Sequence, residues 1–168
     1  MPGSEVAKFG WLIPHIANLG IERPRILDVG TGRGLLIDYL YNGFVAADVD
    51  GIEVWEPYIQ EFNLRGKYNN LFVMDCREFT QWLNYDVVMF GDVLEHMPKE
   101  DAVQIWNAAE GTHRYISIPT VYCPQGHEHG NPYEAHVTDD WTHKEVLETF
   151  SGIKEWSPQY ALVRAYYA

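Results

Sequence analysis

The chain has 168 residues, of which 46% are hydrophobic and 14% aromatic, enough for one domain with a buried core and no need of disulfide or metal staples. Its formal net charge is −12 with no Lys/Arg block, which argues against a nucleic-acid partner and favours a small or peptide-like substrate. No apolar run approaches membrane-spanning length, so we expect no membrane partner.

The two cysteines, Cys76 and Cys123, are expected to be reduced thiols. The first ten residues lack the basic start and apolar core of a secretory segment, which favours a cytoplasmic location. The negative charge has a simpler alternative interpretation, namely that it only keeps the protein in solution. A monomer and a homodimer both remain open.

Apolar patterns alternate between strand-like and helix-like runs along the first two thirds of the chain. We first expect a helix within residues 1–20, capped by Ser4 and weakened by Pro14, then a strand over 25–29, a helix over 34–41 and a strand over 51–54 whose functional end is Glu53. A helix from Glu56 to Gly66, a strand over 71–74 and a helical segment over 78–83 should follow. The next expected elements are a strand over 85–90, a helix opened by Pro98 and a strand over 115–118. Continuous apolar strands separated by helices are typical of a parallel sheet covered on both faces.

The rhythm changes after the fifth strand. Residues 119–140 hold three prolines and two glycines without a sustained period, which predicts a long loop, and open α/β sheets build substrate sites in such loops. A helix capped by Thr142 is expected over 141–150, followed by strands over 153–156 and 160–167 that a tight turn joins. Residues 1–168 are therefore predicted to form one α/β domain with a doubly wound, mostly parallel seven-stranded sheet and a C-terminal antiparallel hairpin.

The most informative stretch is Leu-Asp-Val-Gly-Thr-Gly-Arg-Gly, from Leu27 to Gly34. Glycines between a strand and a helix let backbone approach a ligand closely, because a residue without Cβ adopts positive φ freely. An ordinary strand-to-helix turn is the alternative, but alternate glycines directly after an Asp favour a ligand loop. A dinucleotide loop requires its third glycine at the position of Leu35, so the early Gly34 disfavours a nicotinamide-dependent oxidoreductase.

The pattern Asp28-x-Gly30-x-Gly32-x-Gly34 resembles that of class I S-adenosylmethionine-dependent methyltransferases. The resemblance implies a Rossmann-like fold, S-adenosyl-L-methionine as cofactor, and transfer of its methyl group to an oxygen, nitrogen or carbon of a small molecule. The alternative is a non-catalytic protein that binds S-adenosyl ligands, or a degenerate methyltransferase retained as a partner subunit.

The same resemblance assigns roles around the glycine loop. The carboxylate of Asp28 is expected to hold the cofactor's ammonium group, directly or through water. Arg33 either lies near the cofactor's carboxylate or points outward, and we favour the outward orientation. The cofactor-binding loop itself comprises Gly30, Thr31, Gly32 and Gly34.

Glu53 follows Gly30 by 23 residues, near the interval at which an acid on the second strand reaches ribose hydroxyls. Asp48 and Asp50 are the alternatives if the strand ends earlier, and a solvated acid is the plainest interpretation.

The resemblance also implies that Asp75 accepts a hydrogen bond from the adenine amino group and that the N–H of Cys76 donates to the ring. A helix cap ahead of Glu78 is a second role for Asp75, and both roles are compatible. Asp92 occupies the position that lines the methionine end of the cofactor, and Glu95-His96 follows in a form common among small-molecule methyltransferases.

Methyl transfer from a sulfonium requires alignment, exclusion of water and, for some nucleophiles, a base. Imidazole titrates near neutrality, so the candidate bases are His96, His127, His129 and His136. Neutral imidazoles and a thiolate also bind zinc, which makes Cys123, His127, Glu128, His129 and His136 an alternative metal set. Their spacing fits no established site, so we expect no metal.

Overall fold

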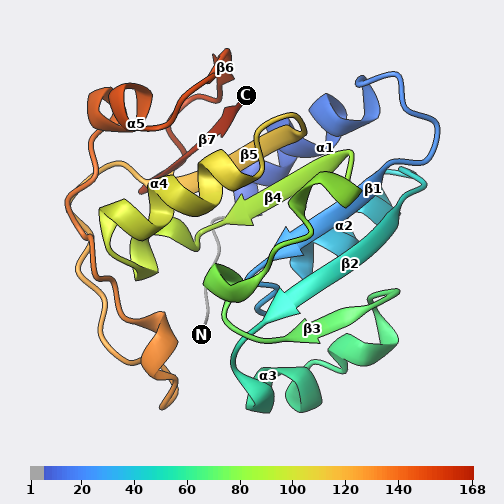
Figure 1. The fold of residues 1–168 in the computed structure, drawn as a ribbon, viewed down its shortest axis with the longest axis horizontal. Coiled ribbons are helices and arrows are strands. Elements are labelled where there is room, and N and C mark those ends of the chain that lie inside the picture. Colours follow the sequence, from blue (N-terminus) through green and yellow to red (C-terminus); the bar gives the residue numbers. More distant parts are fainter. Residues whose placement is uncertain (1–5) are drawn as a thin grey trace.

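The computed structural model describes residues 6–168, so the expected cap at Ser4 lies outside the described residues. Within them, one seven-stranded sheet has the order β3-β2-β1-β4-β5-β7-β6 (Figure 1). The strands are β1 Arg25–Val29, β2 Asp48–Glu53, β3 Leu71–Val73, β4 Val87–Gly91, β5 His113–Pro119, β6 Glu155–Trp156 and β7 Val163–Tyr167. Strands β1 to β5 run parallel, whereas β7 is antiparallel to both β5 and β6. The predicted sheet and hairpin are thus confirmed.

Helices cover both faces of this sheet, as a parallel sheet requires. The helices are α1 Phe9–Ala17, α2 Leu35–Asn42, α3 Glu56–Glu61, α4 Lys99–Ala108 and α5 His143–Thr149. Apolar side chains of α1, α2 and α3 pack in one cluster with one face of the sheet, and those of α4 and α5 pack in another with the opposite face. In Figure 1, α4 lies in front of the sheet and α2 behind it.

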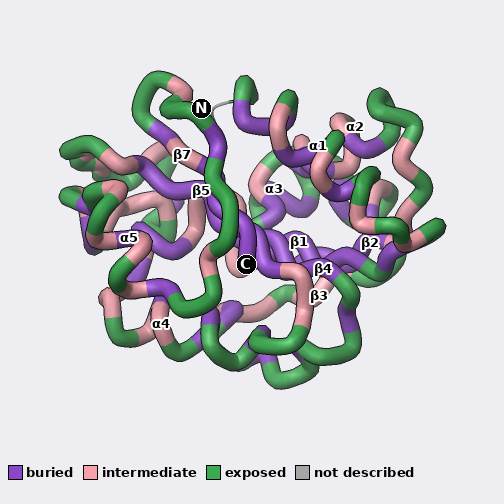
Figure 2. Tube along the Cα trace, turned by 90° about the horizontal axis from the view of Figure 1, so that it is seen from above, coloured by how far each residue is buried: buried purple, intermediate pink, exposed green. Residues whose placement is uncertain are grey.

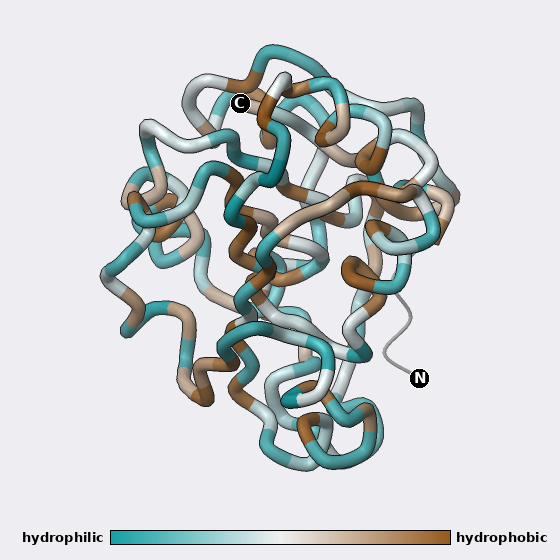
Figure 3. Tube along the Cα trace, turned by 90° about the vertical axis from the view of Figure 1, so that its right-hand side faces the viewer, coloured by the Kyte–Doolittle hydropathy of each residue, from teal (hydrophilic) through white to brown (hydrophobic). Residues whose placement is uncertain are grey.

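Strand β4 illustrates how the sequence builds two cores from one sheet. Val87 and Met89 belong to the cluster of α1 to α3, while Val88 and Phe90 belong to that of α4 and α5, because successive side chains point to opposite faces. All four are almost fully buried. The central strands accordingly run through the buried middle of the molecule in Figure 2, and hydrophobic stretches occupy the interior in Figure 3.

Several element boundaries differ from those expected. Strand β2 begins at Asp48 rather than at residue 51, because its polar first half pairs with β1 through backbone bonds that do not depend on side-chain hydrophobicity. The expected helical segment over 78–83 is replaced by two 3₁₀ turns, η3 Cys76–Glu78 and η4 Trp82–Asn84. The helix after β2 ends at Glu61, and a separate 3₁₀ turn, η2 Leu64–Gly66, completes the connection.

The long loop over residues 119–140 is confirmed, with one short 3₁₀ turn, η6 Pro132–Glu134, inside it. The amides of Val137 and Thr138 donate to the carbonyl oxygen of Glu95 at 2.9 and 3.0 Å. Glu95 lies in the 3₁₀ turn η5 Leu94–His96, which follows β4. These bonds fasten the loop beside the carboxyl end of β4. Across residues 6–168, none of the helices has the length and apolar character needed to cross a bilayer.

Candidate active site

The glycine loop joins β1 to α2 and has left-handed backbone at three positions. Gly30, Gly32 and Gly34 have φ angles of 68°, 50° and 74°. A Cβ on Gly30 would lie 2.3 Å from a methyl carbon of Val93, whereas a Cβ on Gly32 would meet nothing within 4 Å. Gly30 is therefore required by close packing, and Gly32 leaves open space against the backbone where a ligand can approach.

A cavity opens beside this loop at the carboxyl ends of β1, β2 and β4. It holds about 1230 Å³ of empty space, a figure that includes space open to solvent. Its lining joins the strand ends to the long loop and includes Gly30, Gly32, Glu53, Asp75, Cys76, Asp92, Glu95, His96, Cys123, Gln125, Glu134 and His136. One chamber thus contains most of the residues that the sequence singled out.

Glu53 ends β2 and connects it to the glycine loop. Its Oε2 accepts hydrogen bonds from the amide of Gly32 at 2.9 Å and from the hydroxyl of Thr31 at 3.2 Å, while Oε1 accepts from the amide of Trp55 at 2.8 Å. Burial raises the pKa of Glu53, and these three donors oppose that rise. The carboxylate therefore fixes the loop and still lines the cavity, and Oε1 keeps one lone pair beyond its bond from Trp55.

Asp28 does not line the cavity; it lines a second, smaller hollow together with Lys8, Phe9 and Thr31, and Gly30 and Gly32 border both. Its Oδ2 accepts a hydrogen bond of 2.5 Å from the phenol of Tyr68. Burial raises the pKa of Asp28 to about 7, against the opposing effects of Tyr68 and Lys8. A cationic partner beside this buried carboxyl group would favour its ionised form.

Asp92 directly follows β4 and has both carboxylate oxygens engaged. Lys8 Nζ donates to Oδ2 at 2.6 Å, and the Ser117 hydroxyl donates to Oδ1 at 2.7 Å. The backbone of Asp92 has a φ of 55°, which is uncommon for a residue other than glycine and occurs preferentially at functional sites. Lys8 is 1% exposed, so this ion pair is enclosed between the N-terminal segment and the sheet.

Asp75 and Cys76 form the cavity wall beyond β3. Asp75 Oδ1 accepts from the amide of Arg77 at 2.9 Å and caps η3, and Oδ2 accepts from the Arg77 guanidinium at 2.6 Å. This pairing lowers the pKa of Asp75. Burial raises the pKa of the Cys76 thiol to about 12, which keeps it a thiol at neutral pH. The alternative role of Asp75 as a cap is thus confirmed.

The four candidate histidines separate into two pairs. His96 and His136 both line the cavity, and their rings lie 4.9 Å apart. His127 and His129 are exposed and do not belong to the cavity lining. The part of the loop that carries these two histidines lies away from the cavity at the strand ends. The irregular spacing of the loop residues gave no way to predict this position. Burial lowers the pKa of His96, so its imidazole is neutral at physiological pH.

Comparison with known proteins gives the family. Residues 27–111, half of the chain, match the family model of the methyltransferase domain. This chain belongs to the class I S-adenosylmethionine-dependent methyltransferases. Its cofactor is S-adenosylmethionine, and it is an enzyme of that type.

Solved structures share the fold of this methyltransferase at low sequence identity. An S-adenosylmethionine-dependent methyltransferase from Clostridium acetobutylicum ATCC 824 gives a TM-score of 0.68 at 12% identity, covering 97% of this chain and 89% of that one. One from Archaeoglobus fulgidus gives 0.60 at 21% identity, covering 92% and 72%. The 1,6-didemethyltoxoflavin-N1-methyltransferase of Burkholderia thailandensis, solved with 1,6-didemethyltoxoflavin and S-adenosylhomocysteine bound, gives 0.66 at 17% identity, covering 97% and 77%. No curated protein matches the chain.

Three residues of the methyltransferase's site were missed by sequence reasoning, namely Lys8, Tyr68 and Ser117. Ser117 carried a signal, because it is the one hydroxyl in an apolar run near the carboxyl end of β5. The sequence around Lys8 and Tyr68 gave no such signal. Lys8 contacts Asp92, 84 residues away, and Tyr68 contacts Asp28, 40 residues away, so both contacts depend on the tertiary fold.

Proposed function

We propose that this methyltransferase transfers the methyl group to an oxygen, nitrogen or carbon atom of a small molecule bound in the cavity. The observation that carries the proposal is the continuity of the cavity, whose lining runs from Gly32 and Glu53 to His96 and His136. A net charge of −12 supports a small acceptor over a nucleic acid. The toxoflavin-type ligand in the Burkholderia thailandensis methyltransferase gives a precedent on the same fold. Free Cys76 and Cys123 support a cytoplasmic setting.

The residues present fit the cofactor's parts. The open space against Gly32 receives the cofactor beside the backbone, and Glu53 lies within the same wall to accept from the ribose hydroxyls. Asp75 and Cys76 face the adenine from the next strand end. Asp28 lines the second hollow rather than the main cavity, and we propose that it holds the ammonium group of the methionine end from there. Each assignment pairs a donor or charge with its complement.

Asp92 lines the cavity, and we keep it at the methionine end of the cofactor, as the sequence indicated, with a positioning role added. Both of its carboxylate oxygens are already engaged by Lys8 and Ser117, so we assign it to positioning of the wall near the methionine end. Lys8 carries the compensating charge for this carboxylate. An enclosed, paired aspartate of this kind fixes the backbone of the strand end and with it the turn that carries Glu95 and His96.

The cofactor supplies a methyl carbon activated by a sulfonium. Methyl transfer to an acceptor that carries a proton would also require a group that takes up that proton. His96 and His136 line the part of the wall where the acceptor would lie, and a neutral imidazole accepts that proton. The protein otherwise contributes alignment and exclusion of water.

Labelled methyl transfer to a panel of small metabolites tests the proposal. Purified protein is incubated with S-adenosylmethionine carrying an isotopic methyl label, and products are detected by mass spectrometry. We expect one labelled product that disappears in the Gly32→Val variant, which fills the open space against the loop. Label transferred only to RNA, DNA or protein, with none in the panel, would contradict a small-molecule acceptor.

A further inference from the structure

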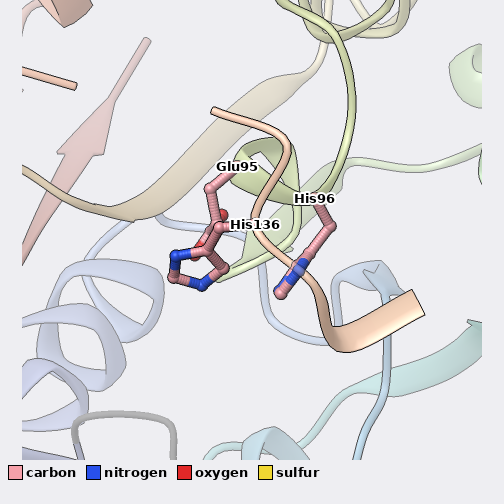
Figure 4. A group of neighbouring side chains, drawn as sticks. All are labelled: Glu95, His96 and His136. Atoms are coloured by element: carbon pink, nitrogen blue, oxygen red, sulfur yellow. The ribbon is translucent and has the colours of Figure 1, made fainter. Parts of the chain in front are cut away.

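Three side chains with metal-binding atoms meet in the cavity wall. Glu95 and His96 belong to η5, and His136 belongs to the long loop (Figure 4). One ligand atom from each residue lies within 4.8 Å of the other two. Four-coordinate ligands about 2.1 Å from a zinc ion lie roughly 3.4 Å apart, so a small side-chain rotation brings the three into coordination distance. The meeting joins residues 40 positions apart in the sequence.

The two histidines are oriented as metal ligands usually are. The Nδ1 atom of His96 donates to the backbone carbonyl of Ala135 at 3.2 Å, and the Nδ1 atom of His136 donates to the carbonyl of Cys123. A proton held on Nδ1 leaves the Nε2 lone pair free. Backbone carbonyls that fix the tautomer in this way are a recurrent outer layer of histidine metal sites.

Glu95 supplies the third group, and one of its carboxyl oxygens lacks a hydrogen-bond partner among the described residues. Its side chain is 1% exposed, and Oε2 has no hydrogen-bond partner among the described residues. A buried carboxyl oxygen without a partner is costly, so buried carboxylates normally carry hydrogen bonds, charge partners or metal ions. The bonds from Val137 and Thr138 to the Glu95 carbonyl hold its backbone beside the loop that brings His136.

We propose that Glu95, His96 and His136 bind one divalent transition-metal ion, such as zinc, with an open coordination position toward the cavity. Two imidazoles and one carboxylate suit zinc, iron and related ions, whereas magnesium prefers sites made of oxygen. Asp92, three residues before Glu95, is not part of this group of atoms, and its oxygens accept from Lys8 and Ser117. The ligand set differs from the loop-based set considered from the sequence, and it revises the expectation that no metal binds.

The position of the metal site in the cavity suggests that the ion binds the methyl acceptor, an inference that rests on the proposed methyl transfer. Glu95, His96 and His136 line the same chamber as the glycine loop. A metal ion with an open position binds an oxygen-bearing substrate and lowers the pKa of the bound hydroxyl. The acceptor class is then a hydroxyl compound whose proton leaves to water as the hydroxyl binds, and the two histidines act as ligands in place of the proton-accepting role proposed for them above.

Metal titration of the full chain tests the site without requiring methyl transfer. The protein is stripped with a chelator, then titrated with zinc by calorimetry and with cobalt while its visible absorption is recorded. We expect one equivalent of zinc to bind and cobalt to give ligand-field bands of a low-symmetry nitrogen–oxygen site, with magnesium failing to compete. Stripped protein that binds no zinc or cobalt stoichiometrically would overturn the proposal.

Variants assign the ligands. Glu95→Gln keeps the shape of the side chain and removes its charge, and His136→Ala alters a partly exposed loop residue rather than the core. Each should weaken zinc binding at least about tenfold. His127→Ala is the matched control, an exposed histidine of the same loop, and should bind zinc as the unaltered protein does. Unchanged binding in folded His136→Ala, or loss in His127→Ala, would place the metal elsewhere. Calorimetry with S-adenosylhomocysteine on the same samples distinguishes failure of this site from failure of the cofactor assignment.

Discussion

Lys8 Nζ lies 2.6 Å from Asp92 Oδ2 and joins the N-terminal segment to the end of β4. The lysine side chain is 1% exposed and that of the aspartate 17%, so the pair is largely removed from water. The Ser117 hydroxyl bridges the two charged groups, because it accepts a hydrogen bond from Lys8 at 2.8 Å and donates one to Asp92 at 2.7 Å. The wall of the cavity near the glycine loop therefore depends on a residue from the start of the chain.

Replacing Lys8 by Met should destabilise the fold by about 3 kcal/mol, because the buried carboxylate of Asp92 loses its charge partner. Urea denaturation followed by tryptophan fluorescence measures the change. Lys144→Met is the control, since its ion pair with Glu148 is exposed at 84% and 65%. That control should change stability by about 0.5 kcal/mol or less. Equal effects of the two variants would show that the Lys8 pair is not buried in solution.

Gly32→Val should reduce S-adenosylhomocysteine affinity by at least about tenfold, because the branched side chain enters the space left open against the loop. Isothermal calorimetry measures the affinity. Gly20→Val is the matched control, since Gly20 also has a positive φ, of 78°, and also lacks neighbours within 4 Å of an added Cβ, but it lies outside the cavity. The two variants should share a cost in stability and differ in binding. Normal binding by Gly32→Val would make the loop a structural turn.

Glu53→Ala should weaken cofactor binding by about 1 to 3 kcal/mol. The variant cannot accept hydrogen bonds from the ribose hydroxyls, and it also loses the bond from the Gly32 amide that fixes the glycine loop. Asp48→Ala serves as the control, because Asp48 is at the other end of β2 and pairs with Arg23 at the surface. Binding measured by calorimetry should be unchanged in the control. Loss in Asp48→Ala with normal binding in Glu53→Ala would shift the ribose contact to the start of the strand.

Asp28 should make the stability of the unliganded protein depend on pH. Its pKa in the fold is about 7, above the usual value of about 4, so between those values the folded state holds a proton that the unfolded state has lost. The free energy of unfolding therefore falls as pH rises from about 4 to 7, by at most about 1.4 kcal/mol per pH unit, and levels off above 7. Urea denaturation at a series of pH values measures the slope.

The Asp28→Asn variant isolates this contribution, because asparagine accepts from Tyr68 without titrating. The difference in unfolding free energy between the unaltered protein and the variant should decline from pH 4 to 7. Lys8 and Glu53 also act on Asp28, the first lowering and the second raising its pKa. A difference that is constant or grows with pH over this interval would mean that Asp28 is ionised in the fold at pH 4.

The sequence predicted the fold well where periodicity and glycine position decide it. The apolar runs around Val29 and Phe90 specified the central strands, and the glycines at 30, 32 and 34 marked the ligand loop because only positive φ and close packing require them there. Strand β2 was placed too late, since the acidic residues Asp48 and Asp50 do not look like a strand although their backbones pair as one.

The site was predicted less completely, for a physical reason. Glu53 ends β2, while Asp75 and Asp92 come within two residues after β3 and β4, and the carboxyl ends of parallel strands meet at one edge of the sheet. The partners of these acids come from elements that sequence order does not place. Tyr68 and His136 each reach the site through a connection whose path depends on tertiary packing, and so neither their contacts nor the exposure of His127 followed from spacing.

Calorimetric titration of the purified full chain with S-adenosylhomocysteine and, in parallel, with NAD tests the central claim most directly. The arrangement of Gly32, Glu53 and Asp28 predicts one equivalent of S-adenosylhomocysteine bound per chain, binding lost in Gly32→Val, and no heat with NAD. Binding of NAD with no response to S-adenosylhomocysteine or S-adenosylmethionine would contradict the assignment of this cavity to the sulfonium cofactor.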